Sequence, residues 1–171
     1  KRHAICTFTS LMLPQDVNTF APTPHRDHRL NLLLTRGGWR EDQTVVQLPS
    51  LLEPMGIRSL TANSGEEATN VIENNVIHIA FVDLSLPLRA GCSKAAPAGE
   101  RILQLLRRLD SPPPTIVLRP RQANARASAR SLARSMQEGA FTVVDRPAKL
   151  ETLLDALRRV LRRYYQNEWP T

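Results

Sequence analysis

The chain has 171 residues, of which 42% are hydrophobic and 23% are charged, a balance typical of a globular domain with a substantial core. No run of eighteen apolar residues occurs, so we expect no membrane-spanning helix. The formal net charge of +7 favours an acidic partner or nucleic acid, but neither a zinc-ligand spacing nor an aromatic-bearing basic strand accompanies it. Two cysteines, Cys6 and Cys92, form neither a disulfide framework nor a metal motif, and they fit a cytoplasmic protein.

The first part of the chain is expected to be an extension followed by alternating strands and helices. Residues 1–28 carry three prolines and read as an N-terminal extension or linker. A strand is expected at residues 29–35 and a helix at residues 42–55, with Val45, Leu48, Leu51, Leu52 and Met55 at helical spacing and Pro49 inside it. A second strand follows at residues 57–62. A capping box, Ser64 to Glu67, then begins a helix that ends near residue 75.

The stretch from Val76 to Pro87 is nearly continuous apolar sequence that ends on a single carboxylate, Asp83. A run of this length, rich in β-branched and aromatic residues, is typical of a strand buried on both faces of a parallel sheet. Functional groups of such sheets lie just beyond the carboxyl ends of the strands. Asp83 is therefore the first candidate functional residue, and a loop aspartate that caps the next helix is the alternative.

The second half continues the alternation. A long loop rich in small residues precedes a helix at about residues 100–110, and a fourth strand is expected at residues 115–118. A helix at residues 122–138, a fifth strand at residues 141–144 and a last amphipathic helix at residues 149–166 complete the pattern. Five strands that alternate with five helices predict an α/β fold, a doubly wound parallel sheet with helices on both faces. The domain is expected to span residues 29–165, and residues 166–171 form a C-terminal tail.

Three pieces in this order resemble a bacterial response-regulator receiver domain, over about residues 29–163. They are the segments Ser64–Ala68, Val82–Pro87 and Gly139–Pro147. The resemblance implies the flavodoxin-like sheet of strand order 2-1-3-4-5. It also implies phosphotransfer from a histidine kinase to the aspartate that Asp83 matches.

Phosphotransfer in that family needs four groups, and the sequence departs from three of them. The acidic pair that holds magnesium is expected where the chain reads Thr35-Arg36-Gly37-Gly38, and Glu41 and Asp42 come about four residues late. The hydroxyl position reads Arg119. The lysine position reads Arg146, followed by Pro147. These departures predict a degenerate site without a metal or other cofactor.

Arg119 in place of a small hydroxyl leaves two interpretations open. Its guanidinium could hold Asp83 in an ion pair and fill the space of a phosphoryl group. Alternatively, the side chain points to solvent and the pocket is vacant. Arg146 is a tolerable substitute for lysine because arginine binds phosphate bidentately.

The departures favour a pseudo-receiver, a protein-interaction module of a two-component phosphorelay without enzymatic activity of its own. A working phosphoacceptor with a rearranged metal site at Glu41 and Asp42 is the first alternative, and a basic nucleic-acid-binding domain is the second. Expected partners are a histidine kinase, an output protein or a second copy, which would bind through the fourth helix, fifth strand and fifth helix. The candidates for this interaction face are the basic residues Arg126, Arg130, Arg134, Arg158 and Arg162.

Overall fold

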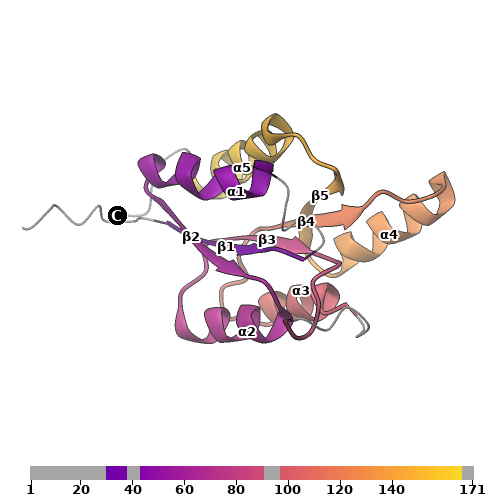
Figure 1. Ribbon diagram of the computed structural model, residues 1–171, viewed down its shortest axis with the longest axis horizontal. Coiled ribbons are helices and arrows are strands. Elements are labelled where there is room, and N and C mark those ends of the chain that lie inside the picture. The colour runs from indigo at the N-terminus through magenta and orange to yellow at the C-terminus, as the bar shows by residue number, and fades with distance from the viewer. Residues whose placement is uncertain (1–29, 38–42, 91–96, 167–171) are drawn as a thin grey trace, which may run out of the picture.

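The computed structural model describes residues 30–37, 43–90 and 97–166, and Figure 1 shows them as a parallel sheet between two layers of helices. The sheet has five strands in the order β2-β1-β3-β4-β5, which confirms the predicted doubly wound topology. The strands are β1 (Leu30–Thr35), β2 (Ile57–Ala62), β3 (Ile79–Asp83), β4 (Thr115–Pro120) and β5 (Ala140–Arg146). The helices are α1 (Gln43–Leu52), α2 (Gly65–Asn74), α3 (Gly99–Arg107), α4 (Ala125–Gln137) and α5 (Leu150–Tyr165), with a 3₁₀ turn at Glu53–Met55.

The side chains of each strand alternate between two apolar layers. Ile79 and Phe81 of β3 and Leu118 of β4 join the core that α1 and α5 cover, whereas Ala80 and Val82 join the core that α2 and α3 cover. Figure 1 shows α1 and α5 on one side of the sheet and α2 and α3 on the other. Because alternate residues point to opposite faces, the same parity decides where the polar residues at the strand ends point.

Helix starts follow the capping signals of the sequence. Ser64 caps α2 by accepting the Glu67 N–H, and the Glu67 carboxylate in turn accepts the Asn63 N–H, so the predicted helix start is confirmed. Helix α4 begins at Ala125, three residues later than expected, because Asn124 accepts the Ala127 N–H as its cap.

Three expectations about the elements were wrong. The strand at Asp83 begins at Ile79, and Val76 lies in the preceding turn with 72% of its surface exposed. Leu51 was expected to face the core but is 44% exposed, because α1 buries Leu48 and Leu52 instead. Met55 is 46% exposed because α1 has ended and the chain forms a 3₁₀ turn at Glu53–Met55. Strand β4 continues to Pro120, which puts Arg119 within the strand.

No helix in the described part of the chain is long and apolar enough to cross a membrane. The expected N-terminal extension, and all but the first residue of the expected C-terminal tail, lie outside the described residues. The proposed domain limits therefore stay predictions.

Candidate functional site

Asp83 is the last residue of β3, and its side chain is fully buried. Its Oδ1 accepts the Ser85 N–H at 2.8 Å and lies 3.5 Å from Nη2 of Arg146. Asp83 thus occupies the carboxyl edge of the central strand, as the sequence predicted, but it lies beneath the surface of the described residues.

Thr35 ties β1 to β3 directly beside Asp83. Its hydroxyl donates to the Phe81 carbonyl at 3.2 Å and accepts the Asp83 N–H at 2.7 Å, and the side chain is fully buried. Thr35 stands where the resemblance places the first metal-binding acid, and here it cross-links two strands instead. The sequence showed its position but not this role, because a hydroxyl in a strand end has many possible partners.

The chain just after β1 passes over the Asp83 carboxylate. A Cβ atom built on Gly37 would lie 2.7 Å from Asp83 Oδ2 and 2.7 Å from the Leu86 main chain. Only a residue without a side chain fits this close approach. The main chain of Gly37 therefore lies directly against the Asp83 carboxylate.

Arg146 is the basic partner of Asp83, and its side chain is only 12% exposed. Its Nη2 donates to Ser85 Oγ at 2.8 Å, and its Nε is buried without a hydrogen-bond partner among the described residues. Pro147 follows Arg146 through a cis peptide bond and is exposed. Of the three residues proposed to line a phosphate pocket, Arg146 alone forms an ion pair with Asp83.

Arg119 takes neither of the orientations proposed for it. Its guanidinium is 4% exposed, and its Nε donates to Asp145 Oδ1 at 2.6 Å. Leu118 is the β4 partner of Asp83 in the sheet register, whereas Arg119 is the partner of Asp145. The side chains of Arg119 and Asp145 therefore point to the face that α3 covers, opposite to Asp83.

Two polar residues complete the environment of Arg119. Its Nη1 donates to the Ser128 carbonyl and its Nη2 to Ser128 Oγ, both at 2.8 Å, and this links β4 to the first turns of α4. Asp145 and Ser128 were not among the predicted site residues. The alternation of β5 could have identified Asp145, since it shares the parity of Val143.

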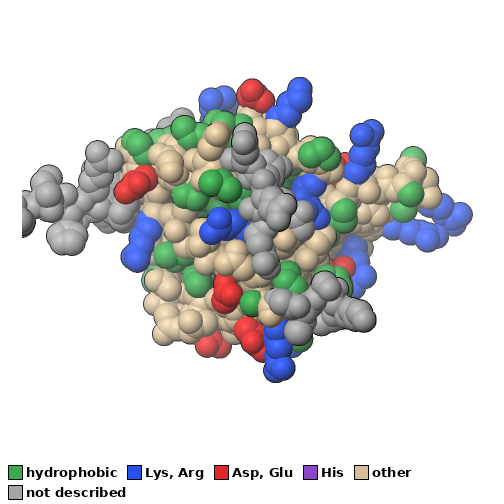
Figure 2. Space-filling model, in the orientation of Figure 1, with side chains coloured by type: hydrophobic (Ala, Val, Ile, Leu, Met, Phe, Trp, Pro, Cys, Tyr) green, Lys and Arg blue, Asp and Glu red, His purple; other side chains and the backbone are tan. Residues whose placement is uncertain are grey.

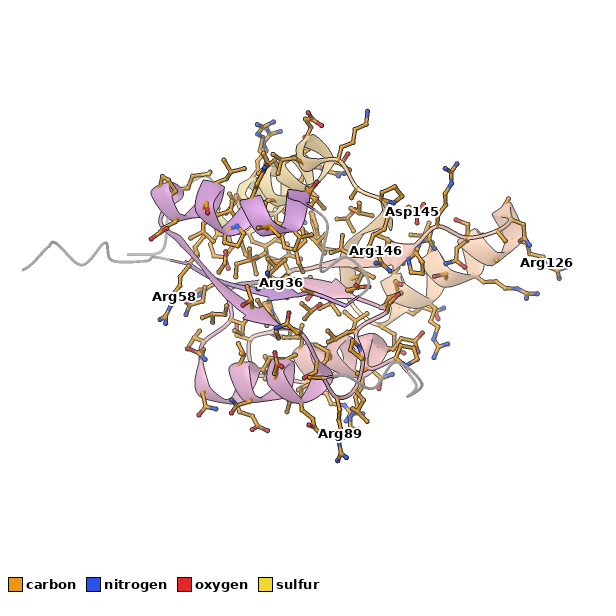
Figure 3. All side chains as sticks on the ribbon, viewed as in Figure 1. Arg36, Arg58, Arg89, Arg126, Asp145 and Arg146 are labelled. Carbon is orange, nitrogen blue, oxygen red and sulfur yellow. The ribbon has the colours of Figure 1, made fainter. Side chains whose placement is uncertain are left out.

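The proposed basic face is partly neutralised within the chain. Arg134 Nη2 lies 2.6 Å from Glu100 of α3, and Arg158 lies 4.0 Å from Asp155. Arg126, near the start of α4, projects from the far end of the molecule (Figure 3). Figure 2 shows basic side chains over this tip and over α5.

The described residues around Asp83 do not suit a magnesium ion. Beside this carboxylate lie a guanidinium and a hydroxyl that already bonds two backbone groups, whereas Mg²⁺ prefers several oxygen ligands and water. No group of three or more His, Cys, Asp or Glu residues that could hold a metal occurs in residues 30–37, 43–90 and 97–166. Glu41 and Asp42, proposed as alternative ligands, lie outside those ranges.

No protein-family model matches the chain, and no curated protein sequence matches it. Several solved structures match the chain in fold. A two-component response regulator from Clostridium difficile has a TM-score of 0.60 at 22% identity, and the match covers 78% of this chain and 97% of that one. The fold is that of a receiver domain.

Two further structures have the same fold. A CheY-like response-regulator receiver domain from Methanospirillum hungatei has a TM-score of 0.59 at 19% identity, covering 81% of this chain and 98% of that one. The receiver domain of a Francisella response regulator has a TM-score of 0.59 at 18% identity, covering 78% of this chain and 98% of that one. The receiver fold therefore accounts for nearly the whole length of these neighbours.

Proposed function

We propose that the chain is a pseudo-receiver, a cytoplasmic protein-interaction module of two-component signalling whose phosphorylation site no longer accepts a phosphoryl group. One observation carries the proposal. Asp83 is fully buried beneath Gly37 and paired with Arg146. A carboxylate nucleophile must reach the phosphorus atom of its donor, whereas this carboxylate is fully buried with the main chain of Gly37 against it.

The neighbouring residues support the same reading. Receiver chemistry, as the resemblance implies, needs a metal to offset the phosphoryl charge and a hydroxyl to bond the new phosphate oxygens. Thr35 replaces an acid and is engaged with backbone groups. Arg119 replaces the hydroxyl and points to the opposite face. Both changes remove groups that stabilise a phosphorylated aspartate.

Phosphorylation by a small donor tests the proposal. The chain is incubated with acetyl phosphate and Mg²⁺, beside a phosphorylatable receiver domain as positive control, and intact mass is measured. We expect no adduct on the chain under conditions that label the control. An adduct on Asp83 that is absent from Asp83→Asn would overturn the proposal and favour the working phosphoacceptor that uses Glu41 and Asp42.

The interaction partner is expected to present an acidic surface to α4. Among the described residues, no acidic side chain lies within ion-pair distance of Arg126 or Arg130, which stand one turn apart on the exposed side of this helix. A histidine kinase, an output protein or a second copy would meet these charges. Binding through them should weaken steeply with added salt, since exposed charges are screened within about 10 Å at 0.1 M ionic strength.

Self-association provides the first measurement of this surface. Sedimentation velocity at low and high salt is compared for the chain and for the double variant Arg126→Gln/Arg130→Gln. If a second copy is the partner, a salt-sensitive dimer should be lost in the variant. Arg158→Gln/Arg162→Gln reports whether α5 contributes to the same surface. A dimer that neither double variant weakens would exclude these arginines from the interface.

A further inference from the structure

Helix α4 is attached to the domain with little apolar burial. Ser135 is its one fully buried residue among Ala125–Gln137, while its large apolar residues, Leu132 and Met136, are 43% and 47% exposed. In contrast, α5 buries Leu153, Ala156, Leu157 and Val160. Since burial of apolar side chains supplies most of the stability of a packed helix, α4 must depend on other contacts.

Polar contacts of arginines connect α4 to the rest of the domain. Arg134 pairs with Glu100 of α3 at 2.6 Å, and Nη1 of Arg107 donates to the Gln137 carbonyl at 3.0 Å. The side chains of Arg134 and Arg107 are 63% and 50% exposed, so water competes with both contacts.

The contact of Arg119 differs because it is buried. Arg119 lies in β4, and its guanidinium connects this strand to two further elements. It donates to Asp145 of β5 and to both the carbonyl and the hydroxyl of Ser128 in α4. The side chain is 4% exposed, so these charge-assisted bonds are largely shielded from solvent. Arg119 thus provides the buried polar contact that holds the N-terminal half of α4 to the sheet.

We propose that α4 opens as a separate unit and that Arg119 sets how often it does so. Opening would release the helix from the face that carries Leu103, Val117 and Ala140, the smallest apolar cluster of the domain. Val143, which packs against this cluster, would also gain exposure. Arg119 is a positioning residue for α4, and its role does not depend on whether Asp83 accepts phosphate. The inference therefore goes beyond the proposed function and stands or falls separately from it.

Hydrogen exchange of the whole chain, resolved to peptides, tests the proposal without any ligand. The amides of Ala125–Gln137 are expected to exchange through a local opening, faster than those of Leu150–Tyr165. Arg119→Gln should increase the population of the open state by about fivefold to tenfold, raising exchange in α4 by that factor. The α5 amides that exchange through global unfolding should accelerate by no more than the same factor, because the Arg119 contacts are lost in that state as well.

Arg146→Gln is the matched control, because it removes an arginine from the same edge of the sheet on the opposite face. It should leave the local opening of α4 unchanged, although α5 amides that exchange through global unfolding should accelerate. Ser128→Ala provides a milder variant if Arg119→Gln does not fold, since it removes one of the three bonds and retains the helix. The proposal would be overturned if α4 exchanged no faster than α5 in the original chain, or if neither Arg119→Gln nor Ser128→Ala accelerated exchange in α4. An equal increase in α4 caused by Arg146→Gln would overturn it as well.

Discussion

Two ion pairs lie at the carboxyl edge of the sheet, on opposite faces of neighbouring strands. Asp145 and Arg146 are consecutive in β5 (Figure 3), so one faces Arg119 and the other faces Asp83. In the first pair the buried member is the arginine, at 4% exposure, and its carboxylate is 50% exposed. In the second pair the carboxylate is fully buried. Removing the arginine therefore leaves a half-exposed carboxylate in the first pair and a fully buried one in the second.

This difference suggests different roles for the ion pairs on the two faces of the sheet. On the α1 and α5 side, Arg146 balances the charge of an aspartate that main chain already covers. On the α3 side, Arg119 fastens a helix that buries little apolar surface. In our proposals, the first of these pairs belongs to a closed site and the second holds α4 in place.

The largest expected effect comes from removing the counter-ion of the buried carboxylate. Arg146→Gln should lower the free energy of unfolding by about 3 kcal/mol, because the Asp83 carboxyl group would remain buried without its cation. Arg119→Gln should cost only about 1 kcal/mol, because Asp145 is half-exposed and can be hydrated. Urea denaturation of both variants measures the difference. An equal or reversed order would contradict the assignment of the closed site to the Asp83 side.

Neutralising the carboxylate itself should also destabilise the chain. Asp83→Asn is expected to cost about 2 kcal/mol at neutral pH, since it weakens the contacts with Arg146 and the Ser85 N–H. In a working receiver this position lies among repelling carboxylates, and the same substitution would be stabilising. Chemical denaturation thus gives opposite signs under the two hypotheses. The double variant Asp83→Asn/Arg146→Gln should lose less stability than the sum of the single variants.

The comparison also explains which parts of the site the sequence could predict. Long periodic segments predicted five strands that alternate with five helices, because apolar spacing determines which faces are buried, whereas the strand order came from the resemblance. Asp83 could be placed for the same reason, as the end of the most apolar strand. The identity of its partner could not, because an arginine side chain is long enough to reach several groups.

Arg119 was misplaced for a specific physical reason. Its role was inferred from the resemblance, which places it at the hydroxyl position after the fourth strand, whereas β4 continues to Pro120 and strand alternation turns Arg119 away from Asp83. A shift of one residue in a strand end reverses the face of a side chain. Sequence periodicity does not define strand ends to one residue, so the partner of Arg119 could not be predicted from it.

The basic residues at the tip of α4 should matter little for stability. Arg126→Gln/Arg130→Gln is expected to change the free energy of unfolding by no more than about 0.5 kcal/mol, because both side chains are exposed. Arg134→Gln should cost slightly more because it removes the contact with Glu100. Thermal unfolding of the double variant and of Arg134→Gln, compared with the original chain, checks this order. A large loss in the double variant would mean that these residues hold α4 and are not available to a partner.

The smallest effect on stability is expected at the amino ends of the strands, where the polar contacts are hydrogen bonds between neutral groups and not ion pairs. His78 Nδ1 accepts the Asn31 N–H at 3.0 Å, and the His78 carbonyl accepts the Tyr165 hydroxyl at 2.8 Å. Burial lowers the pKa of His78 below its ordinary value of 6.5, so the folded state favours the neutral ring. The contribution to stability is therefore complete above pH 6.5 and declines as the pH falls through that value toward the lower folded pKa.

Comparison with His78→Gln, which cannot titrate, isolates this contribution. The original chain should lose more stability than the variant between about pH 7 and pH 5, a range above the usual titration of carboxylates near 4. Parallel stability curves for the two proteins down to pH 5 would show that His78 makes no such contribution.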